Sequence, residues 1–223
     1  MSHDESLLYI LQLSDSGFPT GGFSHSGGLE AALKVNYISE KDSLKTYFNS
    51  CLENIGSFMV PFMRDAYRLY GEMESLVRLD RLCEACTPNH VARRASSRQG
   101  SSLLDTSQRV FSVSSLVEVG DNLPCKHLPV VYGVVCASLG VDIHTATVAF
   151  IFTGIRTMVA SSVRLDLLGP IEAQAVQREL QKEIPAVIER HKQRSSEDAC
   201  MLFPQADICQ NTHDTMFTKL FYS

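Results

Sequence analysis

The sequence has no excess of positive charge, and this absence limits the partners it can attract. Its 223 residues include 20 Lys and Arg against 25 Asp and Glu, which gives a formal net charge of −5. Phosphate backbones and anionic lipid surfaces draw proteins through a basic excess. We therefore expect neither nucleic acid nor a membrane as the main partner.

A basic N-terminal start and a long apolar run are also missing. The first 17 residues, MSHDESLLYILQLSDSG, carry two acids and no Lys or Arg before their short apolar run, unlike a secretory signal. The most apolar windows are Pro129–Val141, which is too short to span a bilayer, and Val148–Val163, which Arg156 interrupts. We expect core helices in a cytoplasmic protein whose seven cysteines stay reduced.

No interdomain linker and no paired strands can be found. No Ser/Gly/Pro-rich segment is long enough to separate two cores, so we predict one domain over residues 1–223, with a flexible N-terminus and a polar C-terminal tail from about residue 195. The β-branched run Val130–Val135 has no second alternating segment to pair with. We therefore predict an all-α, multi-helix, bundle-like fold.

Apolar residues at three- and four-residue spacing mark the expected helices. Ser43 is expected to be the N-cap of one helix, which Pro61 breaks or kinks, and Asp142 the N-cap of another. The remaining predicted helices cover residues 7–13, 65–86, 91–117, 129–140 and 170–184.

The stretch Asp15–Glu30, DSGFPTGGFSHSGGLE, holds five of the thirteen glycines and is called here the glycine segment. Glycine-rich loops can bind phosphate, but Gly28 and Leu29 stand where a phosphate-binding loop needs Lys and Ser or Thr. The segment is therefore not predicted to bind a nucleotide.

Adjacent Ser24, His25 and Ser26 suggest a second chemistry, nucleophilic catalysis. A nucleophile elbow needs glycine two residues to either side of the serine, and Ser26 occupies one of those places around Ser24. A turn whose hydroxyls cap the next helix is favoured. A serine hydrolase using Ser24 or Ser26 remains an alternative.

Two short motifs suggest metal binding. Cys83-Glu-Ala-Cys86 has the spacing of half a thiolate site, and Cys125-Lys-His127 offers a second pair, but no further CxxC completes the set. Residues three apart on a helix simply share a face, so packing is favoured and we predict no metal site and no cofactor. A metal carrier using Cys83, Cys86, Cys125 and His127 remains an alternative.

Two arginines, Arg156 and Arg164, fall within apolar helix faces. An arginine in such a place needs a carboxylate or a carbonyl as partner, and we expect structural pairing for both. For the cluster Arg93–Arg98 a solvated face is expected.

Several motifs resemble those of one known family and follow one another along the chain in the same order as in that family. The most specific is Leu11–Leu33, LQLSDSGFPTGGFSHSGGLEAAL; it is followed by RQGSSLL from Arg98, by the His127–Gly133 pattern and by SSVRLDLLGPIEAQ from Ser161. In this order they resemble UreF, an all-helical family of urease accessory proteins. The ending HDTMFTKLFYS resembles the family's tail, with Lys219 in place of the usual Arg and Asp214 in place of a common Glu.

The resemblance implies a cytoplasmic homodimer with no reaction of its own. Family members bind the accessory protein UreD, also called UreH, and the GTPase UreG, and this assembly docks on apo-urease for GTP-dependent nickel insertion. The residues themselves favour Phe23 as an apolar anchor, which the glycine segment is expected to present together with His25. Partner-binding residues are expected in this segment and the tail: Gly21, Gly22, Phe23, His25, Ser26, Gly27, Gly28, Glu30, Lys219, Leu220 and Phe221.

Overall fold

Helices make up all the regular structure of the computed structural model, which describes residues 3–223. No strand occurs in that range, so the predicted all-α class is confirmed. Met1 and Ser2, the start of the expected flexible N-terminus, lie outside it. In chain order the elements are α1 (His3–Ser14), η1 (Gly22–Ser24), α2 (Leu29–Lys34), α3 (Lys41–Asn54), η2 (Ile55–Met59), α4 (Val60–Arg68), α5 (Met73–Ala85), α6 (His90–Phe111), α7 (Ser114–Asn122), α8 (Leu128–Ser138), α9 (Ile143–Arg164), α10 (Pro170–His191), η3 (Ser196–Asp198), α11 (Pro204–Asn211) and η4 (His213–Thr215).

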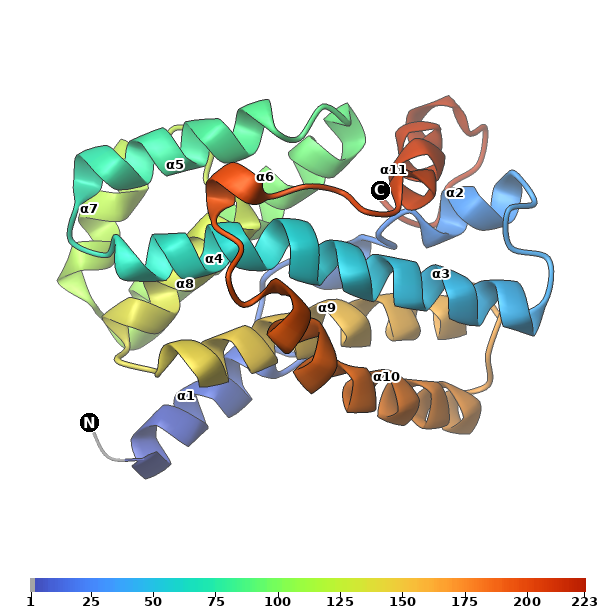
Figure 1. Cartoon of the computed structure of the whole chain (residues 1–223), viewed down its shortest axis with the longest axis horizontal. Coiled ribbons are helices and arrows are strands. Elements are labelled where there is room, and N and C mark those ends of the chain that lie inside the picture. Colours follow the sequence, from blue (N-terminus) through green and yellow to red (C-terminus); the bar gives the residue numbers. More distant parts are fainter. Residues whose placement is uncertain (1–2) are drawn as a thin grey trace.

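The elements α3, η2 and α4 form one continuous helix through residues 41–68 (Figure 1). Of the break or kink expected at Pro61, the break does not occur: the helix widens into the π-helical turn η2 just before Pro61 and continues. Pro61 has no N–H to donate to the carbonyl of Ser57. That carbonyl instead accepts the backbone N–H of Cys200 at 3.3 Å, so the C-terminal part of the chain supplies the missing bond.

Local turn chemistry explains where the other boundaries differ from expectation. Residues 65–86 form two helices, because Gly71 adopts a left-handed φ of 94° between α4 and α5. Residues 91–117 are divided in the same way by Ser112, with φ 54°. The helix α10 was predicted to end before Pro185, but it continues through this proline to His191.

The two predicted N-caps have different outcomes. Asp142 caps α9 as predicted, since its Oδ1 accepts the backbone N–H groups of His144 and Thr145 at 3.1 and 2.9 Å. Ser43 is the third residue of α3 rather than its cap, and its Oγ accepts the N–H of Glu40 at 3.1 Å. The start of α3 is thus a capping box formed by Glu40 and Ser43, where a single N-cap at Ser43 was expected.

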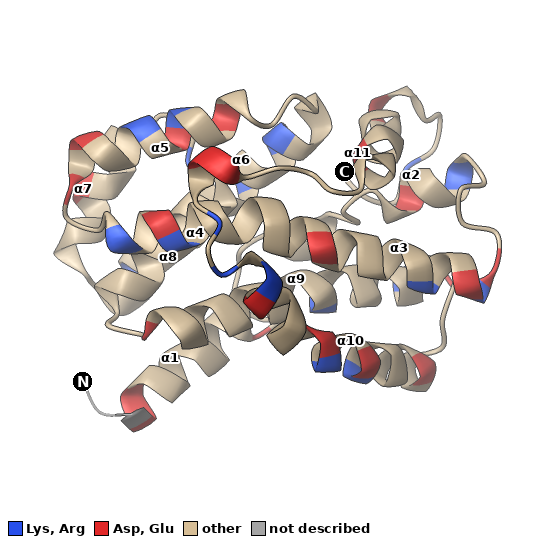
Figure 2. Cartoon of the chain, in the orientation of Figure 1, with Lys and Arg blue, Asp and Glu red and all other residues tan. Residues whose placement is uncertain are grey.

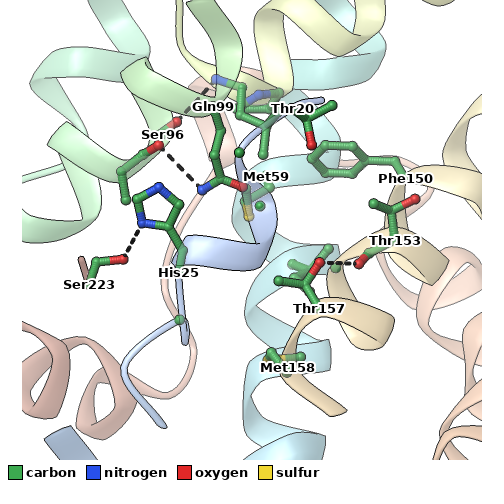
Figure 3. Close-up of a pocket in the computed structure, with 18 of the residues that line it drawn as sticks. Thr20, His25, Met59, Ser96, Gln99, Phe150, Thr153, Thr157, Met158 and Ser223 are labelled. Carbon is green, nitrogen blue, oxygen red and sulfur yellow. Dashed lines mark hydrogen bonds between the residues drawn. The ribbon is translucent and has the colours of Figure 1, made fainter. Parts of the chain in front are cut away.

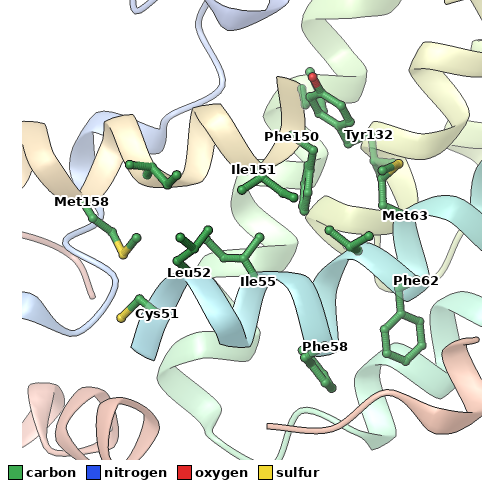
Figure 4. Close-up of a cluster of buried hydrophobic side chains, with 14 of the residues drawn as sticks. Cys51, Leu52, Ile55, Phe58, Phe62, Met63, Tyr132, Phe150, Ile151 and Met158 are labelled. Carbon is green, nitrogen blue, oxygen red and sulfur yellow. The ribbon is translucent and has the colours of Figure 1, made fainter. Parts of the chain in front are cut away.

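The long helix separates two groups of helices. Figure 1 shows α5 and α7 on one side of it and α9 and α10 on the other. In Figure 4, Leu52 and Ile55 of the long helix point toward Ile151 of α9. The helix α8 packs closely along α4 at Gly133, where a Cβ would lie 2.1 Å from the carbonyl oxygen of Met63.

Charges are interspersed over the outer helices. In Figure 2 both signs occur along α3, α5 and α10, whereas the ribbon of α8 carries none. The uncharged sequence of α8 follows from its position, since residues 129–136 are all buried.

One helix in the described range, α9, is long and apolar enough to cross a membrane by length and composition alone. Of its most apolar 18-residue window, 56% is buried inside the protein. It packs against α1, α3, α4, α8 and α10. These contacts are those of a core helix, as expected for Val148–Val163.

Candidate functional site: the glycine segment and the tail

The glycine segment forms a turn that depends on left-handed backbone conformations. Gly21, Gly27 and Gly28 have φ values of 76°, 62° and 89°, a region that residues with a Cβ rarely occupy. At Gly28 a Cβ would also lie 2.9 Å from the hydroxyl oxygen of Tyr47 and 2.9 Å from the Cβ of Gln210. The glycines therefore allow a turn that α3 and α11 approach closely.

The end of the chain lies on this turn. The carbonyl oxygen of Ser223 accepts both the backbone N–H and the hydroxyl of Ser26, each at 2.7 Å. The N–H of Tyr222 donates to the carbonyl of Ser24 at 2.8 Å. Residues about 200 positions apart thus form one unit, which we call the segment–tail unit (residues 15–30 and 213–223).

The side chain of Glu30 holds the tail by hydrogen bonds to its backbone. Its carboxylate is buried and accepts the backbone N–H groups of Leu220 at 2.7 Å and Phe221 at 3.1 Å. The Nε2 atom of buried His213 lies 3.5 Å from the same carboxylate. Glu30 was expected among the partner-binding residues; in the structure its carboxylate holds backbone groups of its own chain.

The expectation that His25 is presented on the surface is wrong. The residue is only 7% exposed, and a hydrogen bond of 2.8 Å joins its Nδ1 to the Oγ of Ser223 (Figure 3). Burial lowers the pKa of His25 to about 4, with smaller contributions from Arg98, Arg94 and His213. Ser26 and Phe221 are buried as well, because the tail covers the turn.

Arg164 joins the two parts of the unit. Its guanidinium lies 3.9 Å from the ring centroid of Phe23 and 4.2 Å from that of Phe221, and it donates to the carbonyl of Phe23. Arg156 donates in the same way to the carbonyl of Ser14. The predicted structural pairing of both arginines is confirmed.

Several apolar side chains of the unit remain exposed. Phe23 is 67% exposed, and Leu220 and Tyr222 are also largely open to solvent. The guanidinium of exposed Arg98 lies 5.9 Å from the ring centroid of Tyr222. Phe23 shares the guanidinium of Arg164 with Phe221, which Leu220 and Tyr222 flank in the chain, and we call the four exposed residues Phe23, Arg98, Leu220 and Tyr222 the aromatic patch.

Lys219 belongs to a charged cluster beside the patch. Its Nζ donates to the carbonyl of Asp214 at 3.2 Å, and the carboxylate of Asp214 is held by both terminal nitrogens of Arg94 at 2.7 and 3.0 Å. Arg94, with His90 and Lys219, lowers the pKa of Asp214 to about 2. The cluster Arg93–Arg98 is therefore not simply solvated, since Arg94 pairs with Asp214 and Arg93 pairs with Glu84.

A cavity of about 750 Å³ lies behind the segment, between α3, α6 and α9. Figure 3 shows His25, Gln99, Thr153 and Thr157 around it. Among the described residues neither Ser24 nor Ser26, the serines of the hydrolase alternative, pairs with His25: the ring bonds to the hydroxyl of Ser223, and the hydroxyl of Ser26 donates to the carbonyl of Ser223. The serine hydrolase alternative has no catalytic dyad here.

The four residues of the metal-carrier alternative do not converge. Cys83 is buried in the core, where burial and Asp80 raise the pKa of its thiol. Within the described residues, the ligand atoms that lie within 4.8 Å of one another belong to Glu84, Cys125 and His127. Sequence reasoning missed Glu84, although it stands between the two cysteines of the first motif.

Comparisons with known proteins agree with the motifs. The model of the UreF family matches residues 38–181. A urease accessory protein F of Oryza sativa subsp. indica is 34% identical over 225 residues, covering 98% of this chain and 86% of the relative. The Arabidopsis thaliana protein of that name is 34% identical, covering 95% and 90%, and urease accessory protein UreF of Arthrobacter sp. (strain FB24) is 28% identical, covering 97% and 96%. These relatives extend the similarity over nearly the whole chain, beyond the range that the family model matches.

Proposed function

The chain belongs to the UreF family of urease accessory proteins, and we propose that it acts as a scaffold in the nickel-dependent maturation of urease. In this proposal it joins the accessory protein UreD or UreH to the GTPase UreG, and regulates GTP-dependent nickel insertion into apo-urease. It works in the cytoplasm as a homodimer and catalyses no reaction itself.

The observation that carries the docking part of the proposal is the aromatic patch. Phe23, Leu220 and Tyr222 are exposed, yet each is attached to backbone fixed by the hydrogen bonds of the segment–tail unit. Exposed aromatic and arginine side chains on an ordered base lose little conformational entropy on binding and often dominate interface energy. The patch therefore supports recruitment of an accessory partner of the UreD type.

Several predicted partner-binding residues act indirectly in this proposal. His25, Ser26, Glu30 and Phe221 are buried, so they position the patch rather than touch a partner. Gly21, Gly22, Gly27 and Gly28 shape the turn beneath it. Phe23 and Leu220 are left as direct contacts, and Lys219 lies at the edge of the patch beside Asp214.

Control of a GTPase needs no phosphate site in this chain. A helical partner can alter GTP hydrolysis by positioning the catalytic groups of the GTPase or by supplying an arginine. The regulatory step is therefore proposed as an effect of assembly.

Phe23→Ala tests the patch directly. The substitution is expected to weaken binding to the UreD-type partner by about 1–3 kcal/mol, since it removes an exposed anchor. Its effect on the free energy of unfolding is expected to stay below about 1 kcal/mol, the size of the lost contact with Arg164. Titration calorimetry with the purified partner and urea denaturation measure the two quantities.

Val117→Ala is the matched control for this test. Val117 is an exposed apolar residue of α7, at the opposite end of the molecule from the tail in Figure 1, and its truncation is expected to leave binding unchanged. Equal binding by wild type and Phe23→Ala would contradict the docking proposal. At the level of the cell, loss of the protein is expected to leave urease present but free of nickel; nickel-loaded urease would refute the maturation role.

A further inference from the structure

Three potential metal ligands meet at a site away from the segment–tail unit. Glu84 lies on α5, and Cys125 and His127 lie on the loop that leads into α8. Their carboxylate oxygen, thiol sulfur and imidazole nitrogen are all within 4.8 Å of one another. His127 is buried, whereas Glu84 and Cys125 are partly exposed, so the site has one anchored side and one open to solvent.

The loop is fixed by Asp80. Its buried carboxylate accepts the backbone N–H groups of Cys125, Lys126 and His127 at 2.7, 2.9 and 3.0 Å. Lys126 adopts a left-handed φ of 56°, and its carbonyl oxygen lies so close to Gly100 that a Cβ there would be 1.9 Å away. The backbone that carries Cys125 and His127 is thus set before any ion arrives, which lowers the cost of assembling a site.

The surroundings of His127 allow the tautomer that a metal needs. The Oγ of Ser96 accepts the N–H of Leu128 at 3.1 Å and lies 3.1 Å from Nδ1 of His127. A hydroxyl oxygen has two acceptor positions, so the second can take the proton of Nδ1. Nε2 bonds to Oε2 of Glu84 at 2.7 Å, and when it gives up the proton of that bond its lone pair is free for a metal ion.

Glu84 is oriented by an outer partner as well. Its other carboxylate oxygen, Oε1, accepts a hydrogen bond from Nη1 of Arg93 at 3.1 Å. A metal ion bound by Oε2 leaves this contact in place. Outer contacts of this kind, to imidazole and to carboxylate, orient the ligands of known metal sites.

We propose that Glu84, Cys125 and His127 bind one divalent transition-metal ion of borderline softness, Zn²⁺ or Ni²⁺, with the fourth position open to solvent. Nitrogen, oxygen and thiolate sulfur together suit such ions better than Mg²⁺ or Ca²⁺, which require oxygen ligands. Binding replaces the hydrogen bond between Nε2 and Oε2, and the protons of that bond and of the thiol pass to solvent. Once the thiol of Cys125 has lost its proton, the negative charges of Asp80, Glu84 and Cys125 outweigh the positive charges of Arg93 and Arg81 and favour a cation here.

The site does not depend on the proposed scaffold function and can be tested on the isolated protein. Zn²⁺ and Ni²⁺ are titrated separately into the full, reduced chain without an affinity tag, and affinity and stoichiometry are measured by calorimetry. Co²⁺ is then used as a spectroscopic probe, since a thiolate ligand gives a charge-transfer band in the near ultraviolet. One ion per chain and a sulfur-to-cobalt band are expected.

Cys125→Ala and Glu84→Gln are the informative variants, because both side chains are partly exposed and their replacement is expected to preserve the fold, which the circular-dichroism spectrum of each variant checks. Each is expected to lower affinity at least about tenfold, and Cys125→Ala also removes the cobalt band. Ser96→Ala is expected to lower affinity about tenfold by freeing the imidazole. Cys200→Ala, at an exposed cysteine outside the site, is the matched control and keeps both affinity and band.

The two ions and the variants give distinct outcomes. Binding of Zn²⁺ alone assigns a zinc site, and binding of Ni²⁺ with equal or higher affinity assigns a site open to nickel; both support the proposal. No binding of either ion by the folded wild type overturns it and leaves the three residues as a purely structural hydrogen-bonded cluster. Equal affinity in wild type and Cys125→Ala overturns it too, even if metal binds elsewhere.

Discussion

At the scale of single residues, burial rather than residue type decides what each side chain of the glycine segment does. Phe23 and His25 are two positions apart, yet one is exposed and the other is enclosed by the tail. His25 has a pKa of about 4, which keeps its ring neutral at physiological pH. A residue that would usually suggest acid–base chemistry is therefore a structural contact to Ser223.

The lowered pKa of His25 makes stability depend on pH. An unfolded chain protonates this residue below about pH 6.5, whereas the folded protein does so only near pH 4, so acid favours unfolding between these values. We expect wild type to lose up to roughly 3 kcal/mol of stability across this window relative to His25→Asn. Asparagine keeps a polar atom near Ser223 and does not titrate.

Urea denaturation of both proteins at several pH values between 7.5 and 4 measures this difference. Other titrating groups are shared by the two chains and cancel in the comparison. Parallel stability curves for wild type and His25→Asn would show that protonation of His25 is not coupled to folding.

At the scale of elements, close helix contacts depend on missing side chains. Gly100 of α6 faces the backbone of residues 126–128, and Gly133 of α8 faces α4. Both glycines belong to the motifs that carry the family resemblance. The motifs RQGSSLL and His127–Gly133 thus mark packing surfaces between helices, and His127 also marks the proposed metal site.

Gly133→Ala is expected to lower the free energy of unfolding by about 2–3 kcal/mol or more. The added Cβ would lie 2.1 Å from the carbonyl oxygen of Met63, and backbone atoms of α4 must move to admit it. Gly169→Ala, where a Cβ meets nothing within 4 Å, is the control and is expected to change stability by less than about 1 kcal/mol. Thermal or urea denaturation that ranks the two variants equally would contradict the packing argument.

At the scale of the whole molecule, the glycine segment near the start of the chain and the tail at its end stabilise each other. Glu30 is buried and its strongest contacts are the N–H groups of Leu220 and Phe221. Without the tail its carboxylate loses both donors, and buried unpaired polar groups are costly. The presentation of the aromatic patch is therefore coupled to the folding of the tail.

A double-mutant cycle measures this coupling. Glu30→Gln in the full chain is expected to cost about 1–3 kcal/mol, because it weakens two charge-assisted hydrogen bonds. In a chain shortened by residues 219–223 the same substitution is expected to cost far less, since those donors are already gone. Equal costs in both backgrounds would mean that Glu30 does not hold the tail.

The sequence alone determined the features that depend on neighbouring residues. The helical class follows from apolar spacing and the lack of a paired strand, and Asp142 was recognisable as a cap because its partners lie two and three residues away. The same holds for the turn shape of the glycine segment, which needs only the glycines themselves. Family motifs were readable for the same reason, as each is a short local pattern.

The tertiary structure decided the features that depend on contacts between distant residues. The burial of His25 and Glu30 requires a tail nearly 200 positions away, and the meeting of Glu84 with His127 requires α5 to pack beside the loop before α8. Likewise, the Ser57 carbonyl that Pro61 leaves without a helical donor is satisfied by the N–H of Cys200, far along the chain. Periodicity and spacing describe a side chain's place on its own helix, but hydrogen bonding and exclusion of water are set by whatever packs against that helix, and only the folded chain brings those groups together.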